Sequence, residues 1–167
     1  MDFLELVTGA RTCRRFREAE GMPAGMLDWL IECARVTPCG GNAQALRFAV
    51  AESPEACAAV FPALKWAGML TDWDGPEAGE RPSGYVAILG EAGTRAKLNA
   101  IDAGIAAQTI QLGRIRGTSA AAFSCPLIRA RSARCWASPR TLSRCSYWRS
   151  ASKRKSAALK PWGLTAP

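Results

Sequence analysis

The acidic residues of this 167-residue chain all lie in its first two thirds, whereas the basic residues continue to its end. All fourteen Asp and Glu residues stand at or before Asp102, and ten of the 22 Lys and Arg residues share residues 1–113 with them. The other twelve basic residues lie in residues 114–167, which contain no acid. A segment with charges of one sign repels itself and resists packing. We therefore expect one folded domain over residues 1–112, and a basic Arg/Ser/Ala-rich tail over residues 113–167 that is poorly ordered.

Length and composition favour a single domain. The chain is 49% hydrophobic, which is enough at this length to bury a core. No apolar run approaches the roughly 18 residues of a membrane span, and the N-terminus is acidic and amphipathic, so we expect a cytoplasmic protein without a membrane segment. Seven cysteines form an odd set, and histidine does not occur. A disulfide scaffold, a zinc site and a His-assisted nucleophile are therefore disfavoured, and no metal site is predicted.

Two amphipathic helices are predicted at the start of the chain. The first begins near Phe3, where apolar residues recur at helical spacing. The second spans Leu27 and Ala34, and the preceding Pro23 suits a position in its first turn.

Two further helices are predicted later in the chain. Ser53 and Pro54 form a typical helix start, with Ser as the N-cap and Pro at the first position. Residues 94–112 combine Ala and Gly with Leu and Ile at helical spacing, which indicates a long helix packed closely on several sides. We expect it to be a core helix or an interface helix.

Two strands and one long loop complete the prediction. Residues 47–52 have the pattern of a strand, and the unbroken apolar run at residues 85–89 indicates a strand buried on both faces. Residues 70–82 are rich in Gly, Pro, Asp and Glu and show no periodicity, so we expect a surface loop there.

The first candidate site is R-T-C-R-R-F at residues 11–16, just after the opening helix. Arg11 and Arg14, with the hydroxyl of Thr12 between them, can surround a phosphate or the polar edge of a heterocycle. The simpler alternative is a solvated helix end, because four arginines stand within residues 11–17.

The second candidate site is T-P-C-G-G-N-A-Q at residues 37–44, which precedes a predicted strand. Its two glycines would allow the backbone to approach a ligand closely, and Asn42 and Gln44 offer paired donors and acceptors. The alternative is a plain helix-to-strand loop in which the glycines only turn the chain.

Taken together, these two segments resemble the flavin nitroreductase family. In that family, R-S-x-R-x-F follows the first helix, and P-S-x-x-N-x-Q-P-W-x-F follows later. Here the second pattern reads P-C-G-G-N-A-Q-A-L-R-F at residues 38–48. K-W-A-G at residues 65–68, W-D-G-P at 73–76, G-E-R-P at 79–82 and D-A-G-I-A-A-Q at 102–108 also resemble one branch of the family. The resemblance covers about 110 residues.

The resemblance implies a homodimer with flavin mononucleotide (FMN) at the subunit interface. Arg11, Thr12 and Arg14 would hold the phosphate and the ring edge. Pro38, Cys39, Gly40 and Asn42 would reach the same flavin from the partner subunit. Thr12 and Cys39 replace the serines of the family pattern, and Cys39 is a weaker hydrogen-bond donor than serine. As a nucleophile, Cys39 would lack a histidine partner.

The implied fold is α+β, a three-layer α/β/α sandwich with a mostly antiparallel central sheet whose C-terminal part is incomplete. The implied activity is NAD(P)H-driven hydride transfer through FMN to a nitroaromatic, a quinone or a similar acceptor, with NADH or NADPH as the reductant. The flavin carries this chemistry, so no catalytic acid or base is required from the chain. Lys65 and Trp66 could line the substrate slot, although a surface Lys and a core Trp are the simpler interpretation. Asp102 and Gln108 would satisfy buried polar groups at the interface.

The tail does not continue the family pattern, which would proceed through an L-G-G-C loop to a core strand. We hypothesise that a frameshift near codons 112–114 replaced it. Combining the third base of each codon with the first two bases of the next forces Leu from Cys135-Trp136, Gly from Trp136-Ala137 and Leu from Tyr147-Trp148. With GC-rich choices at the free positions, residues 118–151 become L-G-G-C-I-L-L-S-L-D-P-x-x-L-R-E-V-L-G-I-P-E-D-L-E-P-L-L-V-L-A-L-G.

Two other functions remain open from the sequence. The chain could be a non-enzymatic basic protein that binds nucleic acid through residues 114–167, where Arg and Lys would neutralise phosphates and Trp136, Tyr147 and Trp148 could stack on bases. The acidic balance of the first 113 residues makes this partner less favoured. The chain could also be an inactive truncated product.

Overall fold

The computed structural model describes residues 2–64, 66–67, 69–90, 93–117 and 148–150. The predicted disorder of the tail therefore concerns residues that lie almost entirely outside the described ones. The helices and strands are α1 (Phe3–Gly9), α2 (Met26–Arg35), β1 (Arg47–Ala51), α3 (Pro54–Val60), β2 (Tyr85–Leu89), α4 (Ala96–Gly117) and β3 (Trp148–Ser150), with single 3₁₀ turns at Glu18–Glu20, Gly40–Asn42 and Phe61–Ala63.

The sheet is antiparallel, with the strand order β2-β1-β3. Strand β1 pairs with β2 over its full length, with Phe48 opposite Ile88 and Val50 opposite Val86. On its other edge, residues 47–49 of β1 pair with β3. Because side chains alternate between the two faces of a strand, this register places Phe48, Val50, Val86 and Ile88 together on one face.

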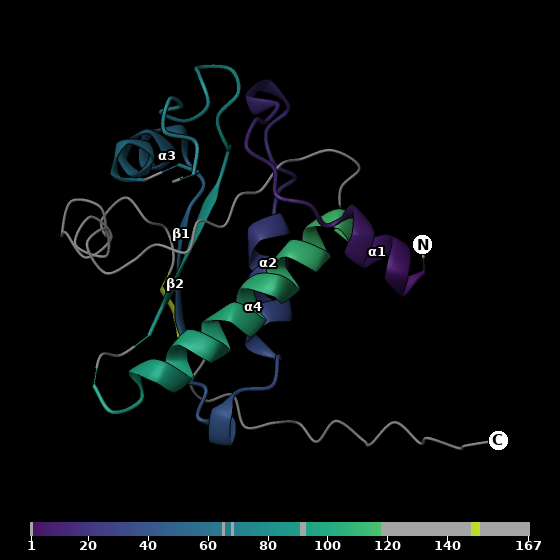
Figure 1. Cartoon of the computed structure of the whole chain (residues 1–167), viewed down its shortest axis with the longest axis vertical. Coiled ribbons are helices and arrows are strands. Elements are labelled where there is room, and N and C mark those ends of the chain that lie inside the picture. The colour runs from purple at the N-terminus through teal and green to yellow at the C-terminus, as the bar shows by residue number, and fades with distance from the viewer. Residues whose placement is uncertain (1, 65, 68, 91–92, 118–147, 151–167) are drawn as a thin grey trace.

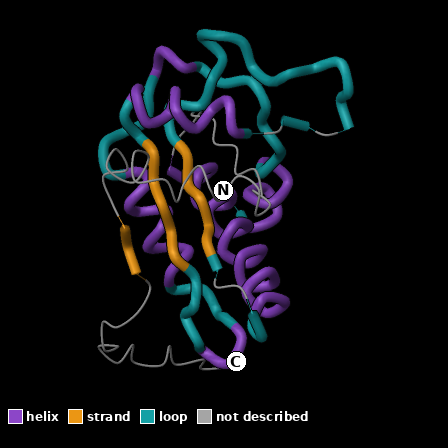
Figure 2. The backbone as a smooth tube through the Cα atoms, turned by 90° about the vertical axis from the view of Figure 1, so that its left-hand side faces the viewer, coloured by secondary structure: helices purple, strands orange, loops and turns teal. Residues whose placement is uncertain are grey.

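Helices cover both faces of the sheet, as Figures 1 and 2 show. On one face, Phe48, Val50 and Val86 pack against α2 and α4. On the other face, Ala49, Ala51, Tyr85 and Ala87 pack with residues of α3. The three-layer α/β/α arrangement and the α+β class are confirmed, and so is the burial of the 85–89 strand on both faces.

The predicted helix starts have different outcomes. Ser53 caps α3 as predicted, because its Oγ accepts a hydrogen bond of 3.2 Å from the backbone N–H of Ala56. The predicted place of Pro23 in the first turn of the second helix is wrong. Helix α2 begins at Met26 after Gly25, whose φ of 77° favours glycine, and Pro23 lies outside the helix with its carbonyl accepting from the Met26 N–H.

Two predicted boundaries also shift. Strand β1 ends at Ala51, one residue earlier than predicted. Helix α4 begins at Ala96 and runs to Gly117, beyond the predicted end at Leu112. The extra turn matters, because it carries a side chain that holds one of the candidate site segments.

Helix α4 is both a core helix and a surface helix. Ala106 and Ile110 are fully buried against α2 and the sheet, whereas Leu98, Ile101 and Ile105 are 43%, 61% and 38% exposed. Nothing in the described part of the chain, α4 included, has the length and apolar character needed to cross a membrane.

Helix α4 lies close to α2 at Gly113. A Cβ added there would lie 2.9 Å from Cδ2 of Leu30, which is 1% exposed and has no room to move. We predict that Gly113→Ala lowers the free energy of unfolding by about 1–3 kcal/mol, the usual cost of overpacking a core. Urea denaturation measures the change. In a Leu30→Val background, which lacks the Cδ2 atom, the same substitution should cost clearly less, and an equal cost in both backgrounds would contradict the packing argument.

Candidate functional site

The arginine segment, residues 11–16, runs along the C-terminal end of α4. Two side chains of α4 hold its backbone: Gln111 Nε2 donates to the carbonyl of Ala10 at 2.7 Å, and an Arg114 guanidinium N–H donates to the carbonyl of Arg11 at 3.1 Å. Both α4 side chains are at least half buried, so these bonds are shielded from water. The segment is therefore anchored by its carbonyl groups while its own side chains are left for other contacts.

The four arginines of residues 11–17 do not share one role. Arg15 pairs with Glu80 at 3.5 Å and Arg17 pairs with Glu20 at 2.9 Å. Arg11 and Arg14 are exposed, and within the described residues no carboxylate pairs with either of them. Two guanidinium groups without a protein acid nearby can accept an anionic ligand. The structure thus separates the two arginines that the family resemblance selects from the two that serve as ordinary surface ion pairs.

Thr12 is exposed between these two arginines, and Phe16 anchors the far end of the segment. The Phe16 ring is 6% exposed, and its backbone N–H donates to the carbonyl of Glu80 at 3.0 Å. The arginine segment is consequently fixed at both ends, with its polar side chains on the surface between them.

The glycine loop, residues 37–44, lies at the other end of α4. The Gly40 N–H donates to Asp102 Oδ1 at 2.9 Å, and an Arg95 guanidinium N–H donates to the Gly40 carbonyl at 2.8 Å. Both polar groups of Gly40 are thus bonded to α4 or to the turn that leads into it. Pro38, Gly41 and Asn42 remain exposed, and Cys39 is half buried.

The backbone of the glycine loop is unusual. Gly41, Asn42 and Gln44 have φ values of 61°, 48° and 48°, in the left-handed region. Such a conformation costs little for glycine, less for Asn than for most residues, and is unfavourable for Gln. The Sγ of Cys39 accepts a hydrogen bond of 3.3 Å from the Gln44 N–H and so supports this turn. Strained backbone of this kind is concentrated at functional sites.

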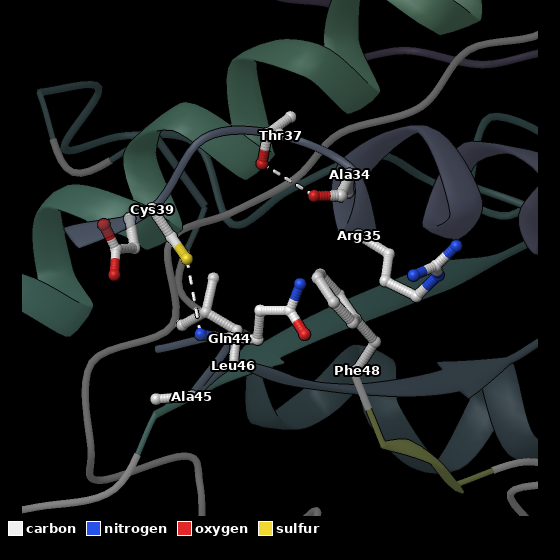
Figure 3. Close-up of a pocket in the computed structure, with 9 residues that line it drawn as sticks. Ala34, Arg35, Thr37, Cys39, Gln44, Ala45, Leu46 and Phe48 are labelled. Carbon is white, nitrogen blue, oxygen red and sulfur yellow. Dashed lines mark hydrogen bonds between the residues drawn. The ribbon is translucent and has the colours of Figure 1, made fainter. Parts of the chain in front are cut away.

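A small cavity borders the glycine loop. Its volume is about 20 Å³, and it lies between the end of α2, the loop, the start of β1 and α4. Figure 3 shows Cys39, Gln44 and Phe48 around it, with the hydrogen bond from Gln44 to Cys39 at its edge. Asp102 also lines this cavity.

The two segments are attached to α4 about three turns apart. Asp102 and Arg114 are twelve residues apart, which corresponds to roughly 18 Å along a helix that rises about 1.5 Å per residue. One helix thus holds the arginine segment near one end and the glycine loop, with its left-handed residues, near the other.

Comparison with known proteins identifies the family of this chain. A sequence model of the Nitroreductase family matches residues 7–122, which include both segments and most of the described elements. The chain belongs to the Nitroreductase family. No curated protein matches it.

Solved structures agree on the fold. A nitroreductase family protein from Clostridium novyi NT superposes with a TM-score of 0.52 at 19% identity, over 68% of this chain and 63% of that one. A putative NADH dehydrogenase/NAD(P)H nitroreductase from Bacteroides thetaiotaomicron VPI-5482 gives 0.51 at 20% identity, over 66% and 59%. A nitroreductase with bound FMN from Desulfitobacterium hafniense DCB-2 gives 0.51 at 22% identity, over 66% and 62%. This nitroreductase-family chain therefore aligns with about three fifths of the length of these proteins.

Of the two predicted substrate-slot residues, Trp66 is described by the structure, and it is part of an aromatic cluster. Trp66 is 8% exposed and packs against Phe16, Phe61 and Trp73, with ring centroids 6.5, 5.6 and 6.3 Å from its own. Lys65 lies outside the described residues. The assignment of these two residues to a slot stays a prediction.

Among the described residues of this nitroreductase-family chain, two groups have clearly shifted pKa values, and both lie outside the two segments. Burial raises the pKa of the Tyr85 phenol well above its usual range, on the α3 side of the sheet. Burial, with a smaller effect of the neighbouring Glu32 carboxylate, raises the pKa of the Cys33 thiol in α2. Both groups are thereby held in their neutral form near neutral pH, and neither is poised as a general acid or base.

Four residues hold the two segments, and one of them, Asp102, was singled out from the sequence. The prediction that Asp102 satisfies a buried polar group agrees with its bond to the Gly40 N–H, but Gln108 lies exposed on α4. The roles of Arg95, Gln111 and Arg114 were missed. The only available signal was their polar character in an otherwise apolar helical stretch, which does not reveal which loop they meet.

Proposed function

We propose that this chain is built as an FMN-dependent oxidoreductase that takes a hydride from NADH or NADPH and passes electrons to a nitroaromatic, a quinone or a similar acceptor. Membership of the Nitroreductase family supports this, as does the bound FMN of the Desulfitobacterium hafniense neighbour. The similarity to the NADH dehydrogenase/NAD(P)H nitroreductase of Bacteroides thetaiotaomicron supports NAD(P)H as the reductant. The observation that carries the proposal is the pair of exposed arginines, Arg11 and Arg14, without acidic partners among the described residues.

The chain's own residues would bind and orient the flavin. Arg11 and Arg14 suit the FMN phosphate, because a guanidinium presents several N–H donors to phosphate oxygens and stays charged. The Thr12 hydroxyl would add a donor between them. Pro38, Cys39, Gly40 and Asn42 would meet the flavin of the partner subunit, with Asn42 offering both a donor and an acceptor. When bound, FMN supplies the hydride chemistry, and these residues supply its position and electrostatic surroundings.

A homodimer is part of the proposal. Helices α1 and α4 lie against each other and leave large apolar side chains exposed, namely Phe3, Leu4 and Val7 of α1 and Leu98, Ile101 and Ile105 of α4. Large apolar side chains left exposed on neighbouring helices are a feature of protein interfaces. The placement of the two segments at opposite ends of α4 suits two half sites that are each completed by the other subunit.

A further proposal concerns the tail: residues after about codon 113 are encoded out of frame. The charge asymmetry and the forced codons support it, and so does the end of the family match at residue 122. The position of β3 also agrees with it, because Trp148–Ser150 falls within the apolar run L-V-L-A-L-G of the alternative frame. Whether the chain with its present tail is active depends on this point.

Flavin binding is the first test. We predict that the purified protein is yellow or takes up added FMN, and that Arg11→Ala and Arg14→Ala each weaken FMN binding by about 10- to 150-fold, the loss expected for a charge-assisted hydrogen bond of about 1.5–3 kcal/mol. Quenching of FMN fluorescence measures the dissociation constant, and NADH and NADPH oxidation reports turnover. Arg17→Ala is the matched control, because Arg17 already pairs with Glu20. A protein that takes up no FMN, or that instead binds DNA with steep salt dependence, would contradict the proposal.

The dimer is tested by a charge on its proposed interface. Ile101→Glu should shift the protein to a monomer in sedimentation equilibrium and should abolish retention of FMN, since each site would lose residues from the partner. Ala58→Glu places the same charge on an exposed position of α3 and should leave both properties unchanged. A wild-type protein that holds FMN as a monomer would rule the interface out.

The frame of the tail is tested at the level of DNA. We expect resequencing of the source gene to find one additional base near codons 112–114. With that base inserted, each downstream codon begins at the third base of a present codon, which is the alternative frame described above. A gene with that base inserted should encode a protein with acidic residues after Asp102. If the present frame is intact in the source and shared by close relatives, the proposal is wrong.

A further inference from the structure

We infer that Asp102 and Arg95 are positioning residues for the flavin: they fix Gly40 to α4 from both of its polar groups and thereby hold the glycine loop in a conformation it would not keep alone. The inference rests on the proposed function, because it concerns the same FMN site. It assigns a role to two residues that would not touch the flavin themselves.

The first support is the geometry of this clamp, by which we mean the two hydrogen bonds that join Gly40 to Asp102 and to Arg95. The Gly40 N–H meets Asp102 Oδ1 at 2.9 Å and the Gly40 carbonyl meets Arg95 at 2.8 Å. Asp102 is 3% exposed, so its bond to the amide forms in a region shielded from water, where such a bond is stronger. A carboxylate on an N–H and a guanidinium on a carbonyl are both charge-assisted, which makes them the strongest bonds of the loop.

The second support is that few other side-chain hydrogen bonds hold the loop. Thr37 Oγ1 donates to the carbonyl of Ala34 at 2.7 Å, but this bond lies at the start of the loop. At its other end, the Gln44 N–H donates to Cys39 Sγ, and sulfur is a weak acceptor. The Gln44 carbonyl accepts a long bond of 3.4 Å from an Arg47 guanidinium N–H. The two bonds of the clamp are therefore the main polar contacts in the middle of the loop.

The third support is the backbone that follows the clamped residue. Asn42 and Gln44 have φ values of 48°, and such left-handed residues persist where surrounding contacts enforce them. Releasing Gly40 would let this stretch relax. Since Pro38, Cys39 and Asn42 are the proposed flavin contacts, relaxation would displace them from the geometry that binding requires.

The clamp also changes the role proposed for Gly40. With both polar groups engaged by Asp102 and Arg95, Gly40 is an anchor of the loop and not a donor to the flavin. The side of Gly40 that a Cβ would occupy faces Leu98 and Asp102 at 3.5 and 3.7 Å, which agrees with close packing on α4. The flavin contacts of this loop would then be made by Pro38, Cys39 and Asn42.

The test compares Asp102→Ala with Asp102→Asn in the full-length protein. Asn keeps an oxygen that can accept from the Gly40 N–H, whereas Ala does not. In flavin-free protein, we expect hydrogen exchange at the Gly40 amide to rise at least about tenfold in the Ala variant, with the amides of α2 and β1 unchanged and the Asn variant close to wild type. The dissociation constant of FMN should rise by about tenfold or more in the Ala variant alone.

A second variant removes the other hydrogen bond of Gly40, the one that its carbonyl accepts from Arg95. Arg95→Met should also weaken FMN binding, while Lys97→Met, an exposed basic residue at the start of α4, is the matched control and should not. This second pair keeps the inference testable if Asp102→Ala does not fold.

The outcomes separate this inference from the proposed function. A wild-type protein that binds no FMN would overturn the proposed function, whatever the exchange rates show. A wild-type protein that binds FMN, with Asp102→Ala and Arg95→Met of equal affinity, would overturn the positioning role alone. Unchanged exchange at Gly40 in the Ala variant would also overturn it, as would faster exchange across the whole chain, which would mark a general structural role.

Discussion

The packing of α4 is the constraint on which the rest of this structure depends. Its buried side carries Ala106 and Ile110 into the core beneath the sheet, and its glycine at position 113 allows α2 to approach closely. The same helix holds the arginine segment through Gln111 and Arg114. Hydrophobic burial thus fixes the position of α4, and α4 in turn fixes the positions of the arginine segment and the glycine loop.

The polar residues of α4 are costly within an apolar helix and are stabilised by the loops they meet. A buried carboxylate such as Asp102 requires a donor, and the Gly40 amide provides it. A loop with left-handed residues requires external support, and α4 provides it. The core and the candidate site are therefore linked, since the same hydrogen bond gives a partner to one oxygen of a buried carboxylate and holds the glycine loop on α4.

Much of the fold could be predicted from the sequence because it depends on local patterns. The period of apolar residues located four helices and two strands, and Ser53 marked its helix start. The prediction from Pro23 was wrong, because a proline is compatible both with the first turn of a helix and with the segment before it. The left-handed backbone of Gly25 sets the start of α2 at Met26. The third strand was not predicted from its own residues, because its pairing with β1 is a long-range contact.

By itself, the sequence determined the element types, the Nitroreductase family resemblance and the two segments that would face a flavin, because each depends on residues close together along the chain. Only the tertiary structure decided which arginines are free to take an anion and which pair with Glu80 and Glu20. It alone showed that Asp102 and Arg95 meet at Gly40, more than fifty residues away. The physical reason is that ion pairs and hydrogen bonds between distant segments follow from how helices and sheet pack, which local patterns do not encode.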